Sequence, residues 1–248
     1  WLQYGDHSQY QHLVVPHIRF PLLSMDILVN KVVDSKLVSN EELLSLLVYV
    51  GSNRVRAYTG SFGTKPFRIS TVECKHAFDF DENGVIYYLG SKGKTLPFVN
   101  PHPSIVTVSA SSIGIGNISL LTNRQSDVFF TDDISNSWLQ IDLGPHHSLQ
   151  CNNFTLQHEG YYFMNALKSF EWQARANESD EWTVLYKHDG TPMTYTPYGR
   201  STFSVPASAS ANGFYRYFRL LQTDVNSSNN NELRCSGIEM YGTLKLHA

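Results

Sequence analysis

Carboxylates that could work in pairs are the first candidates for chemistry in this sequence. Asp79, Asp81 and Glu82 lie close together, and Asp132 and Asp133 are adjacent. Glycoside cleavage needs two carboxyl groups that face each other across a cleft. Most of these residues stand in hydrophilic turn segments, where Asp side chains accept hydrogen bonds from backbone N–H groups. We therefore interpret them as turn residues and predict that the protein is not an enzyme.

The sequence offers no other recognisable catalytic or metal-binding pattern. It contains no nucleophile elbow, zincin helix or P-loop. His146 and His147 are adjacent, so on a strand they would point to opposite faces and could not hold one ion. Residues 131–136, TDDISN, could donate oxygens to Ca²⁺ but lack the spacing of an EF-hand. We predict no metal site and no cofactor, while a structural Ca²⁺ at 131–136 stays open.

Asp142 is a carboxylate inside an apolar segment, SWLQIDLG at residues 137–144. On a strand it would share a face with Trp138, and the large aliphatic residues would take the other face. Burial without a partner would cost several kcal/mol. We therefore expect Asp142 to accept backbone N–H bonds from a turn or to pair with an arginine such as Arg216 or Arg219. This predicts a structural role for Asp142 and for Arg219.

The composition is that of an ordinary globular protein of 248 residues, with 42% hydrophobic and 17% charged residues. A net charge of −3 argues against nucleic-acid binding, which normally needs a basic surplus. There is neither an apolar run long enough to cross a membrane nor a signal peptide. The three cysteines, Cys74, Cys151 and Cys235, are an odd, sparse set, which favours a reducing compartment. We expect a cytoplasmic, intracellular protein without membrane insertion and, because the first residue is Trp1, a fragment.

The first part of the sequence has a helical pattern. Ser24 is placed to cap the start of one helix, and Ser39 with Glu42 forms a capping box before a second apolar helix. Gly, Ser and Thr then become frequent, which indicates a linker. We predict three segments, which are helices in 1–54, a linker in 55–73 and a domain in 74–248.

From about Cys74 onward the pattern changes to short strands. The apolar or alternating segments are GVIYYLG, SIVTVSAS, SWLQIDLG, NNFTLQHE, SFEWQARA, WTVLYKH, FYRYFRLLQT and GIEMYG. Turn sequences such as DENG and DGTP separate them, without intervening helices. This arrangement predicts a mainly β fold, a β-sandwich or jelly roll. Trp138, Trp172 and Trp182 lie inside strand segments, and we expect their rings in the core.

In this order, the segments resemble an intracellular discoidin domain of the F5/8 type C-like family. The matching pieces are NGVIYYLG, the NP at Asn100 and Pro101, NSWLQIDLG, NNFTLQH, ALKSFEWQARANESDEWTVLYKH, YRYFRLLQT and CSGIEMYG. The resemblance implies a discoidin-like jelly-roll β-sandwich that binds its ligand through loops at one end. The pattern W-x-x-[IV]-D-L-G belongs to the discoidin framework, in agreement with a structural Asp142. Secreted discoidin domains close their ends with a disulfide, so a bond between Cys74 and Cys235 stays open.

The helical segment HIRFPLLSMDILVNKVVDSKLVSNEELLSLLVYV resembles the last helices of a BACK domain. A BACK segment followed by a discoidin domain is similar to the BTB–BACK–discoidin proteins, in which the BTB domain binds cullin-3 and the C-terminal module recruits a target. This resemblance implies the substrate-recruiting part of a ubiquitin ligase adaptor. Cullin-3 binding would require a BTB domain, which these residues do not include, and whether one precedes Trp1 stays open.

Three segments match the ligand loops of discoidin domains, residues 91–103, 121–127 and 158–165. They are rich in Tyr, Phe and Arg, the residue types that dominate binding hot spots. The predicted ligand-binding residues are Lys92, Lys94, Phe98, His102, Arg124, His158, Glu159, Tyr161, Tyr162 and Phe163.

Several alternatives stay open at these loops. Phe98 and Phe163 could plug the end of the sandwich, and Arg124 could form a loop salt bridge. Residues 191–200, with Tyr195 and Tyr198, are either a further contact loop or an ordered crossing. The first hypothesis for the ligand is a protein or peptide, and the alternatives are a glycan or a phospholipid. The oligomeric state is also open.

Overall fold

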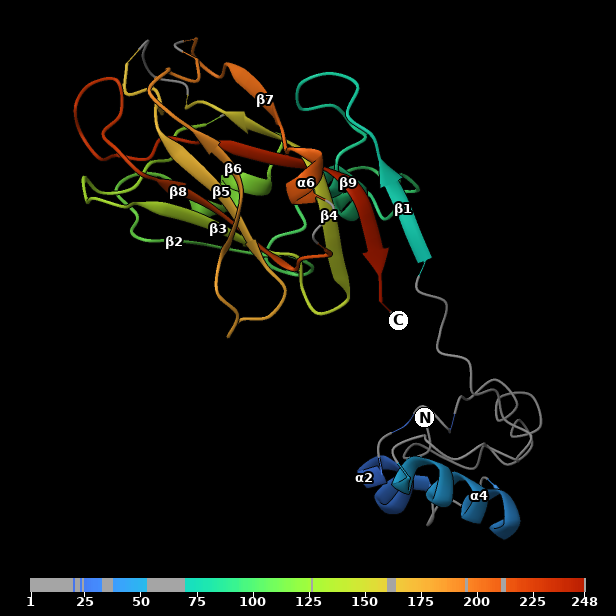
Figure 1. Ribbon diagram of the computed structural model, residues 1–248. Coiled ribbons are helices and arrows are strands. Elements are labelled where there is room, and N and C mark those ends of the chain that lie inside the picture. Colours follow the sequence, from blue (N-terminus) through green and yellow to red (C-terminus); the bar gives the residue numbers. More distant parts are fainter. Residues whose placement is uncertain are drawn as a thin grey trace. The chain divides into compact units, whose positions relative to one another are not determined.

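The computed structural model divides the chain into two compact units, residues 1–68 and 69–248 (Figure 1). The structure describes residues 20, 23, 25–32, 38–52, 70–125, 127–159, 164–194, 196–210 and 213–247. The first strand of the second unit starts at Ser70, a few residues before the predicted domain start at residue 74. None of the described helices is long and apolar enough to cross a membrane.

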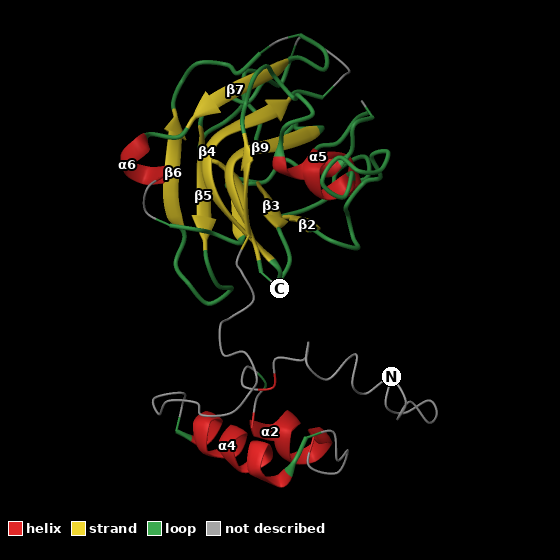
Figure 2. Ribbon diagram, turned by 90° about the vertical axis from the view of Figure 1, so that its right-hand side faces the viewer, coloured by secondary structure: helices red, strands yellow, loops and turns green. Residues whose placement is uncertain are grey.

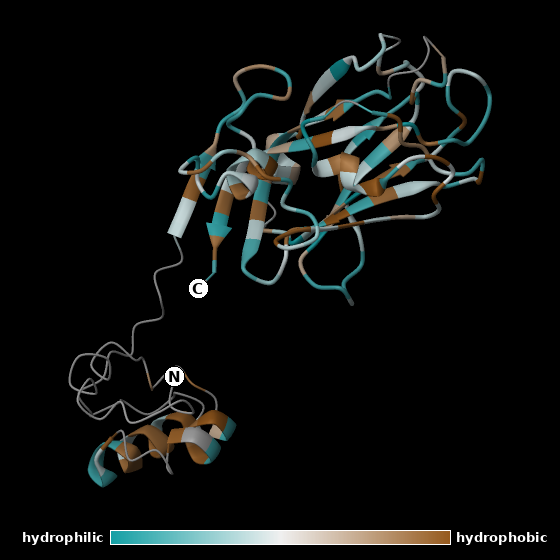
Figure 3. Cartoon of the chain, turned by 180° about the vertical axis from the view of Figure 1, so that it is seen from behind, coloured by the Kyte–Doolittle hydropathy of each residue, from teal (hydrophilic) through white to brown (hydrophobic). Residues whose placement is uncertain are grey.

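The first unit contains helix α2 (Met25–Ile27), which continues as the π-helical turn η4 (Leu28–Val32), and helix α4 (Asn40–Gly51). The predicted cap of the second helix is present, because the Ser39 hydroxyl accepts a hydrogen bond from the Glu42 backbone N–H over 3.2 Å. The predicted cap at Ser24 lies outside the described residues. Apolar residues dominate both helices (Figure 3). Their buried members form a small separate core of Phe20, Leu28, Val32, Leu46 and Val50.

The second unit is a β-sandwich of two antiparallel sheets, as the sequence pattern predicts. The four-stranded sheet has the order β1 (Ser70–Cys74), β9 (Gly237–Leu246), β4 (His147–Gln157) and β7 (Arg200–Ser204). The five-stranded sheet has the order β2 (Thr107–Ala110), β3 (Trp138–Asp142), β8 (Tyr217–Gln222), β5 (Phe170–Arg175) and β6 (Thr183–His188).

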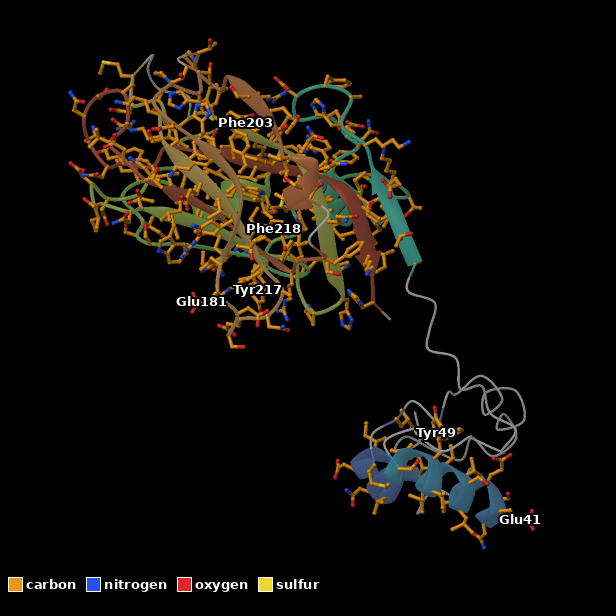
Figure 4. All side chains as sticks on the ribbon, in the orientation of Figure 1. Glu41, Tyr49, Glu181, Phe203, Tyr217 and Phe218 are labelled. Carbon is orange, nitrogen blue, oxygen red and sulfur yellow. The ribbon has the colours of Figure 1, made fainter. Side chains whose placement is uncertain are left out.

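Aromatic stacking joins the two sheets in the core. Phe154 of the four-stranded sheet stacks on Trp172 of the five-stranded sheet at 4.6 Å between ring centres, and Trp172 stacks in turn on Phe218 at 5.7 Å. Trp172 is fully buried, as predicted. Trp138 and Trp182 are only half-buried, because they belong to the side of the five-stranded sheet that faces away from the core. Figure 4 labels Tyr217 and Phe218 at the start of β8, and both are buried.

One segment predicted as a strand is a helix. Residues 84–90, GVIYYLG, form α5 (Val85–Gly90), which lies beside β9 (Figure 2). The Glu239 carboxylate of β9 accepts hydrogen bonds from the backbone N–H groups of Ile86 at 2.8 Å and Tyr87 at 3.1 Å. A short apolar run does not distinguish a buried strand from a buried helix, and this cap comes from a residue far away in the sequence. Two further short helices are η5 (Ile118–Thr122) and α6 (Ala207–Ser210).

Because all strand pairs are antiparallel, the connecting segments gather at two ends of the sandwich. We call the end where β4 finishes and β9 begins the apical end, and the end where β3 finishes and β8 begins the basal end. At the apical end lie the described parts of the connecting segments 75–84, 111–137, 158–169, 189–199 and 223–236. At the basal end lie the described parts of segments 143–146, 176–182 and 205–216.

Candidate functional site

The predicted ligand-binding residues do not form one cluster. Lys92 lines a hollow together with Gly144 and His147, which belong to the basal end, whereas Arg124 and Glu159 belong to the apical segments. Tyr161, Tyr162 and Phe163 lie outside the described residues. The long segment 91–103 therefore runs between the two ends and does not join the other two predicted loops as one surface.

Two further residues of this segment have local partners. The exposed Lys94 ammonium donates a hydrogen bond to Asn83 Oδ1 at 2.7 Å. The His102 Nδ1 accepts a hydrogen bond from the Val108 backbone N–H at 3.3 Å. His102 thereby supports the start of β2.

Arg124 forms a salt bridge, which is the alternative that the sequence left open. Its Nη2 lies 2.5 Å from Glu239 Oε2, and it also donates to the backbone carbonyls of Phe80 and Asp81. The guanidinium carbon lies 4.7 Å from the Phe80 ring centre and 5.0 Å from that of Tyr87. Arg124 thus fastens segment 75–84 to β9.

Burial raises the pKa of the Glu239 carboxyl to about 7, while Arg124 and the backbone N–H donors around it act in the opposite direction. Phe98 stacks on Tyr87 at 5.4 Å between nearly parallel rings and is half-buried. It packs over α5 and closes this structural cluster.

His158 and Glu159 are fully buried and hold an apical turn in place. The His158 N–H donates to the Gly199 carbonyl at 2.8 Å, and the Glu159 carbonyl accepts from the Tyr198 N–H at 3.5 Å. The Glu159 carboxylate pairs with Arg234 at 2.9 Å. These two residues therefore position the turn that carries Tyr198 and do not line an open surface themselves.

An open hollow lies where segment 75–84 meets this turn. It has a volume of about 730 Å³ and is lined by His76, Ala77, Phe78, Asp79, Tyr198 and Arg200, a set that we call the apical hollow. Phe78 is 67% exposed and Tyr198 is 36% exposed, which is unusual for such large rings. The hollow thus combines two solvent-facing aromatic rings with a cation and a carboxylate.

Arg200 is held from one side only. Its Nε donates to Gln157 Oε1 at 3.0 Å, and its guanidinium carbon lies 5.0 Å from the Phe80 ring centre. Within the described residues its two terminal amino groups have no hydrogen bond. An anchored guanidinium with free N–H groups is a ready donor for a ligand, because little side-chain entropy is left to lose.

The Asp79 carboxylate is also held through one of its polar atoms. Its Oδ1 accepts from the Thr202 hydroxyl at 2.7 Å and lies 3.8 Å from His76 Nε2. Its other oxygen has no hydrogen bond to a described residue, and the side chain is 48% exposed. Asp79 can therefore accept a hydrogen bond from a ligand in the apical hollow.

A second apical hollow is more apolar. It has a volume of about 660 Å³, and we call it the apical groove. Its walls include Ile115 at 56% and Met164 at 54% exposure, and the Arg234 guanidinium covers the Phe130 ring at 4.1 Å. It is lined by Ile115, Gly116, Asp127, Val128, Phe130, Met164, Asn165 and Arg234.

Asp142 pairs with Arg216, one of the two arginines that the sequence offered. Arg216 donates from Nε to Oδ1 at 2.6 Å and from Nη2 to Oδ2 at 2.7 Å, and Asp142 also accepts from the Gly144 N–H at 2.8 Å. Arg219 instead donates to Gln173 Oε1 at 2.8 Å and covers the Trp182 ring. Both predicted structural residues thus contact neighbouring strands.

No group of three or more potential metal ligands occurs among the described residues. Cys74, Cys151 and Cys235 are free and buried, so the open alternative of a Cys74–Cys235 disulfide is not realised. Burial raises the pKa of each thiol to about 12, which leaves them unreactive near neutral pH.

The residues of the apical hollow were largely missed by sequence reasoning. The sequence pattern predicts Asp79 only as a turn carboxylate and leaves two alternatives open for Tyr198. The sequence does contain one indication, since Tyr198 precedes a glycine in a Pro-containing turn, and it adopts a left-handed φ of 54°. Phe78 and Arg200 come from distant segments, and only the fold brings them together.

Curated relatives are much longer than this chain. E3 ubiquitin-protein ligase Ufd4 of Drosophila melanogaster is 30% identical over 174 residues, which is 67% of this chain and 6% of that protein. E3 ubiquitin-protein ligase hecd-1 of Caenorhabditis elegans is 30% identical over 185 residues, 70% of this chain and 7% of that protein. A BTB/POZ domain-containing protein of Arabidopsis thaliana is 25% identical over 225 residues, 85% of this chain and 27% of that protein. No family model matches the chain.

Solved structures with a similar fold include several whose names mention carbohydrates. CpGH89CBM32-5 from Clostridium perfringens, in complex with GalNAc-beta-1,3-galactose, has a TM-score of 0.44 at 8% identity and covers 56% of this chain and 96% of its own. The CBM32-3 of a family 31 glycoside hydrolase from the same organism has a TM-score of 0.46 at 10% identity, covering 56% and 92%. A fucolectin from striped bass (Morone saxatilis) serum has a TM-score of 0.44 at 16% identity, covering 56% and 47%. Likenesses at this level do not assign a ligand to this chain.

Proposed function

We propose that residues 69–248 form a discoidin-like recognition module without catalytic activity, and that its apical hollow binds a saccharide. The observation that carries this proposal is the exposure of Phe78 and Tyr198 beside Arg200 and Asp79. Sugar rings present apolar C–H faces that pack on aromatic rings, and their hydroxyl groups need nearby donors and acceptors. Both kinds of contact are available in this one hollow.

The number of carboxylates in the hollow supports a binding role over a catalytic one. Asp79 is the single carboxylate among the described residues that line it. Hydrolysis of a glycosidic bond uses two carboxyl groups on either side of the bond. Glu159 and Glu239, the two fully buried glutamates, are each paired with an arginine and serve the fold. We propose that Arg200 donates to sugar oxygens and that Asp79 accepts from a sugar hydroxyl.

A glycan array with the full chain, followed by calorimetric titration of the best sugar, tests this proposal. Phe78→Ala and Arg200→Gln should each weaken binding about tenfold, the usual size of a hot-spot contact. Two variants outside the hollow serve as matched controls. Ile134→Ala removes an exposed apolar side chain, as Phe78→Ala does, and Lys187→Gln removes a positive charge, as Arg200→Gln does. Sugar binding that survives both test variants, or no binding to any glycan, would refute the saccharide assignment.

A second candidate ligand, a peptide, is favoured by a different observation. The apical groove is bordered by exposed Ile115 and Met164 and contains Arg234 and Asp127 at its polar side. Apolar walls with a few charged groups suit a peptide better than a sugar. A peptide-display selection tests this candidate, since selected peptides should lose affinity on Ile115→Ser and keep it on Phe78→Ala.

We also propose that the module recruits targets within a larger ubiquitin ligase or ligase adaptor. The support is the similarity to two E3 ligases and to a BTB/POZ protein, each of which this chain matches over a small share of its length. In this proposal residues 1–54 are BACK-like helices, the linker that follows them ends before β1 at Ser70, and the protein acts in the cytoplasm. Cullin-3 would be reached only through a BTB domain elsewhere in the protein. Proximity labelling with the full-length protein in cells tests the role, and labelling without any ligase component would contradict it.

A further inference from the structure

The outer side of the five-stranded sheet carries an unusual arrangement of two arginines on one indole ring. Arg175 lies at the end of β5, Arg219 in the middle of β8, and Trp182 just before β6. The two guanidinium carbons lie 4.4 Å and 4.3 Å from the Trp182 ring centre. We call these three residues the arginine–tryptophan cluster.

Neither arginine of the cluster is neutralised within the described residues. The ion pairs of the described part of the chain include no partner for Arg175 or Arg219. Arg175 donates to the Glu178 backbone carbonyl, and Arg219 donates to the side-chain oxygen of Gln173. Two positive charges are thus held beside one ring by neutral acceptors.

Two carboxylates on strands of this sheet already have partners. Asp142 holds Arg216 with both of its oxygens. Glu171 accepts from Gln173 at 2.7 Å and lies 3.8 Å from the Lys187 ammonium. Glu171 also acts on Arg219 through space and favours its charged form. Neither Glu171 nor the loop residues Glu178, Asp180 and Glu181 form a direct ion pair with Arg175 or Arg219 within the described residues.

Parts of the cluster are also incompletely hydrogen-bonded. The Arg175 Nε is buried and has no partner among the described residues. Burial and the neighbouring Arg175 both lower the pKa of the Arg219 guanidinium, which is the direction expected for a desolvated cation beside a like charge. A buried N–H group without a hydrogen bond costs free energy, so the cluster is not fully satisfied by its own neighbours.

We propose that the arginine–tryptophan cluster is a docking site for an acidic segment of a partner protein, separate from the apical hollow. Charge complementarity carries the assignment, because two unneutralised guanidinium groups match two carboxylates. Guanidinium groups stacked on an aromatic ring keep their N–H edges free, and these edges bind carboxylates with two parallel hydrogen bonds. The same side of the sheet adds apolar contact area from Val184, 45% exposed, and from half-buried Trp138.

Fluorescence anisotropy with a labelled hexaglutamate peptide and the full chain tests the proposal. The peptide should bind at low salt and weaken as salt rises, and a hexalysine peptide should not bind. Arg219→Gln and Arg175→Gln should each weaken hexaglutamate binding about tenfold, the effect of losing one hydrogen bond to a charged group. Arg219→Lys, which keeps the charge but loses the planar fork, should weaken it by a smaller factor.

The controls separate this site from general attraction and from the proposed saccharide site. Lys187→Gln removes one charge from the same sheet where the lysine is already paired, so binding should change little. Phe78→Ala should leave hexaglutamate binding unchanged, whatever its effect on sugars. Equal weakening by Lys187→Gln and Arg219→Gln would overturn the proposal in favour of diffuse charge attraction. Absence of hexaglutamate binding, or tighter binding of a matched phosphoserine peptide, would overturn the assignment of a carboxylate occupant.

Discussion

Asp142, the last residue of β3, and Arg216, the residue just before β8, are joined by two parallel hydrogen bonds of 2.6 Å and 2.7 Å. The carboxylate is 18% exposed and the guanidinium 31% exposed, so solvent screens the pair only in part. The Tyr217 ring lies against the same arginine at 4.7 Å. This pair fastens the basal end of the five-stranded sheet.

Asp142→Asn should therefore destabilise the β unit without changing ligand binding. Loss of a two-point charged contact should lower the free energy of unfolding by about 1–2 kcal/mol. Urea denaturation at pH 7 measures the change. The pair of Glu171 and Lys187, 3.8 Å apart, provides the control, because the lysine side chain is 65% exposed and Lys187→Gln should cost almost nothing. If Asp142→Asn abolished binding at unchanged stability, the structural assignment of Asp142 would be wrong.

The three tryptophans that the sequence placed together in the core should differ strongly on truncation. Trp172 is fully buried between two aromatic rings, so Trp172→Ala should cost about 3–5 kcal/mol of unfolding free energy. Trp138 and Trp182 are half-buried, and their alanine variants should cost about 1 kcal/mol each. Denaturation midpoints of the three variants give the comparison, and equal losses would contradict the observed burial.

Strand alternation explains which of these features the sequence could predict. The two-residue period put Asp142 on a face with Trp138, and the turn residues separated most strands correctly. The same period could not tell the inner side of the sheet from the outer side for Trp182, which stands at a strand end where the arginines of neighbouring strands cover it. Local patterns contain no information about which sheet a strand joins.

The helix α5 and the apical hollow depend on contacts between distant segments. The apolar residues 85–89 suit a strand or a helix equally, and Glu239, more than 150 residues later, caps the helix that forms. Phe78 and Arg200 likewise become neighbours only after the strands pair. The sequence predicts Arg124, His158 and Glu159 as ligand-binding residues, whereas in the structure each makes contacts that position a turn.

Gly84 is required by the close approach of the Glu239 side chain. A Cβ atom on residue 84 would lie about 2.0 Å from Glu239 Cδ, although the backbone conformation at this glycine is an ordinary one. Gly84→Ala should therefore displace the cap of α5 and cost about 1–3 kcal/mol by overpacking. Thermal unfolding measures this effect. Gly190→Ala is the comparison, because nothing lies within 4 Å there and only its φ of +76° opposes the change. A smaller loss of thermal stability for Gly84→Ala than for Gly190→Ala would show that the Glu239 side chain can move aside without destabilising α5.

Glu239 should make the stability of the β unit depend on pH. Its pKa in the folded protein is raised from 4.5 to about 7, chiefly by burial. Between these two values the folded protein keeps a proton that the unfolded chain has released, so the free energy of unfolding falls as the pH rises through this range. The variant Glu239→Gln lacks this titration. The stability difference between the native protein and Glu239→Gln should therefore shrink from pH 5 to pH 7.5, as measured by urea denaturation at constant ionic strength. A difference that stays constant over the same range would mean that Arg124 and the backbone N–H groups keep Glu239 ionised already at pH 5, and that their attraction offsets the burial of the carboxylate.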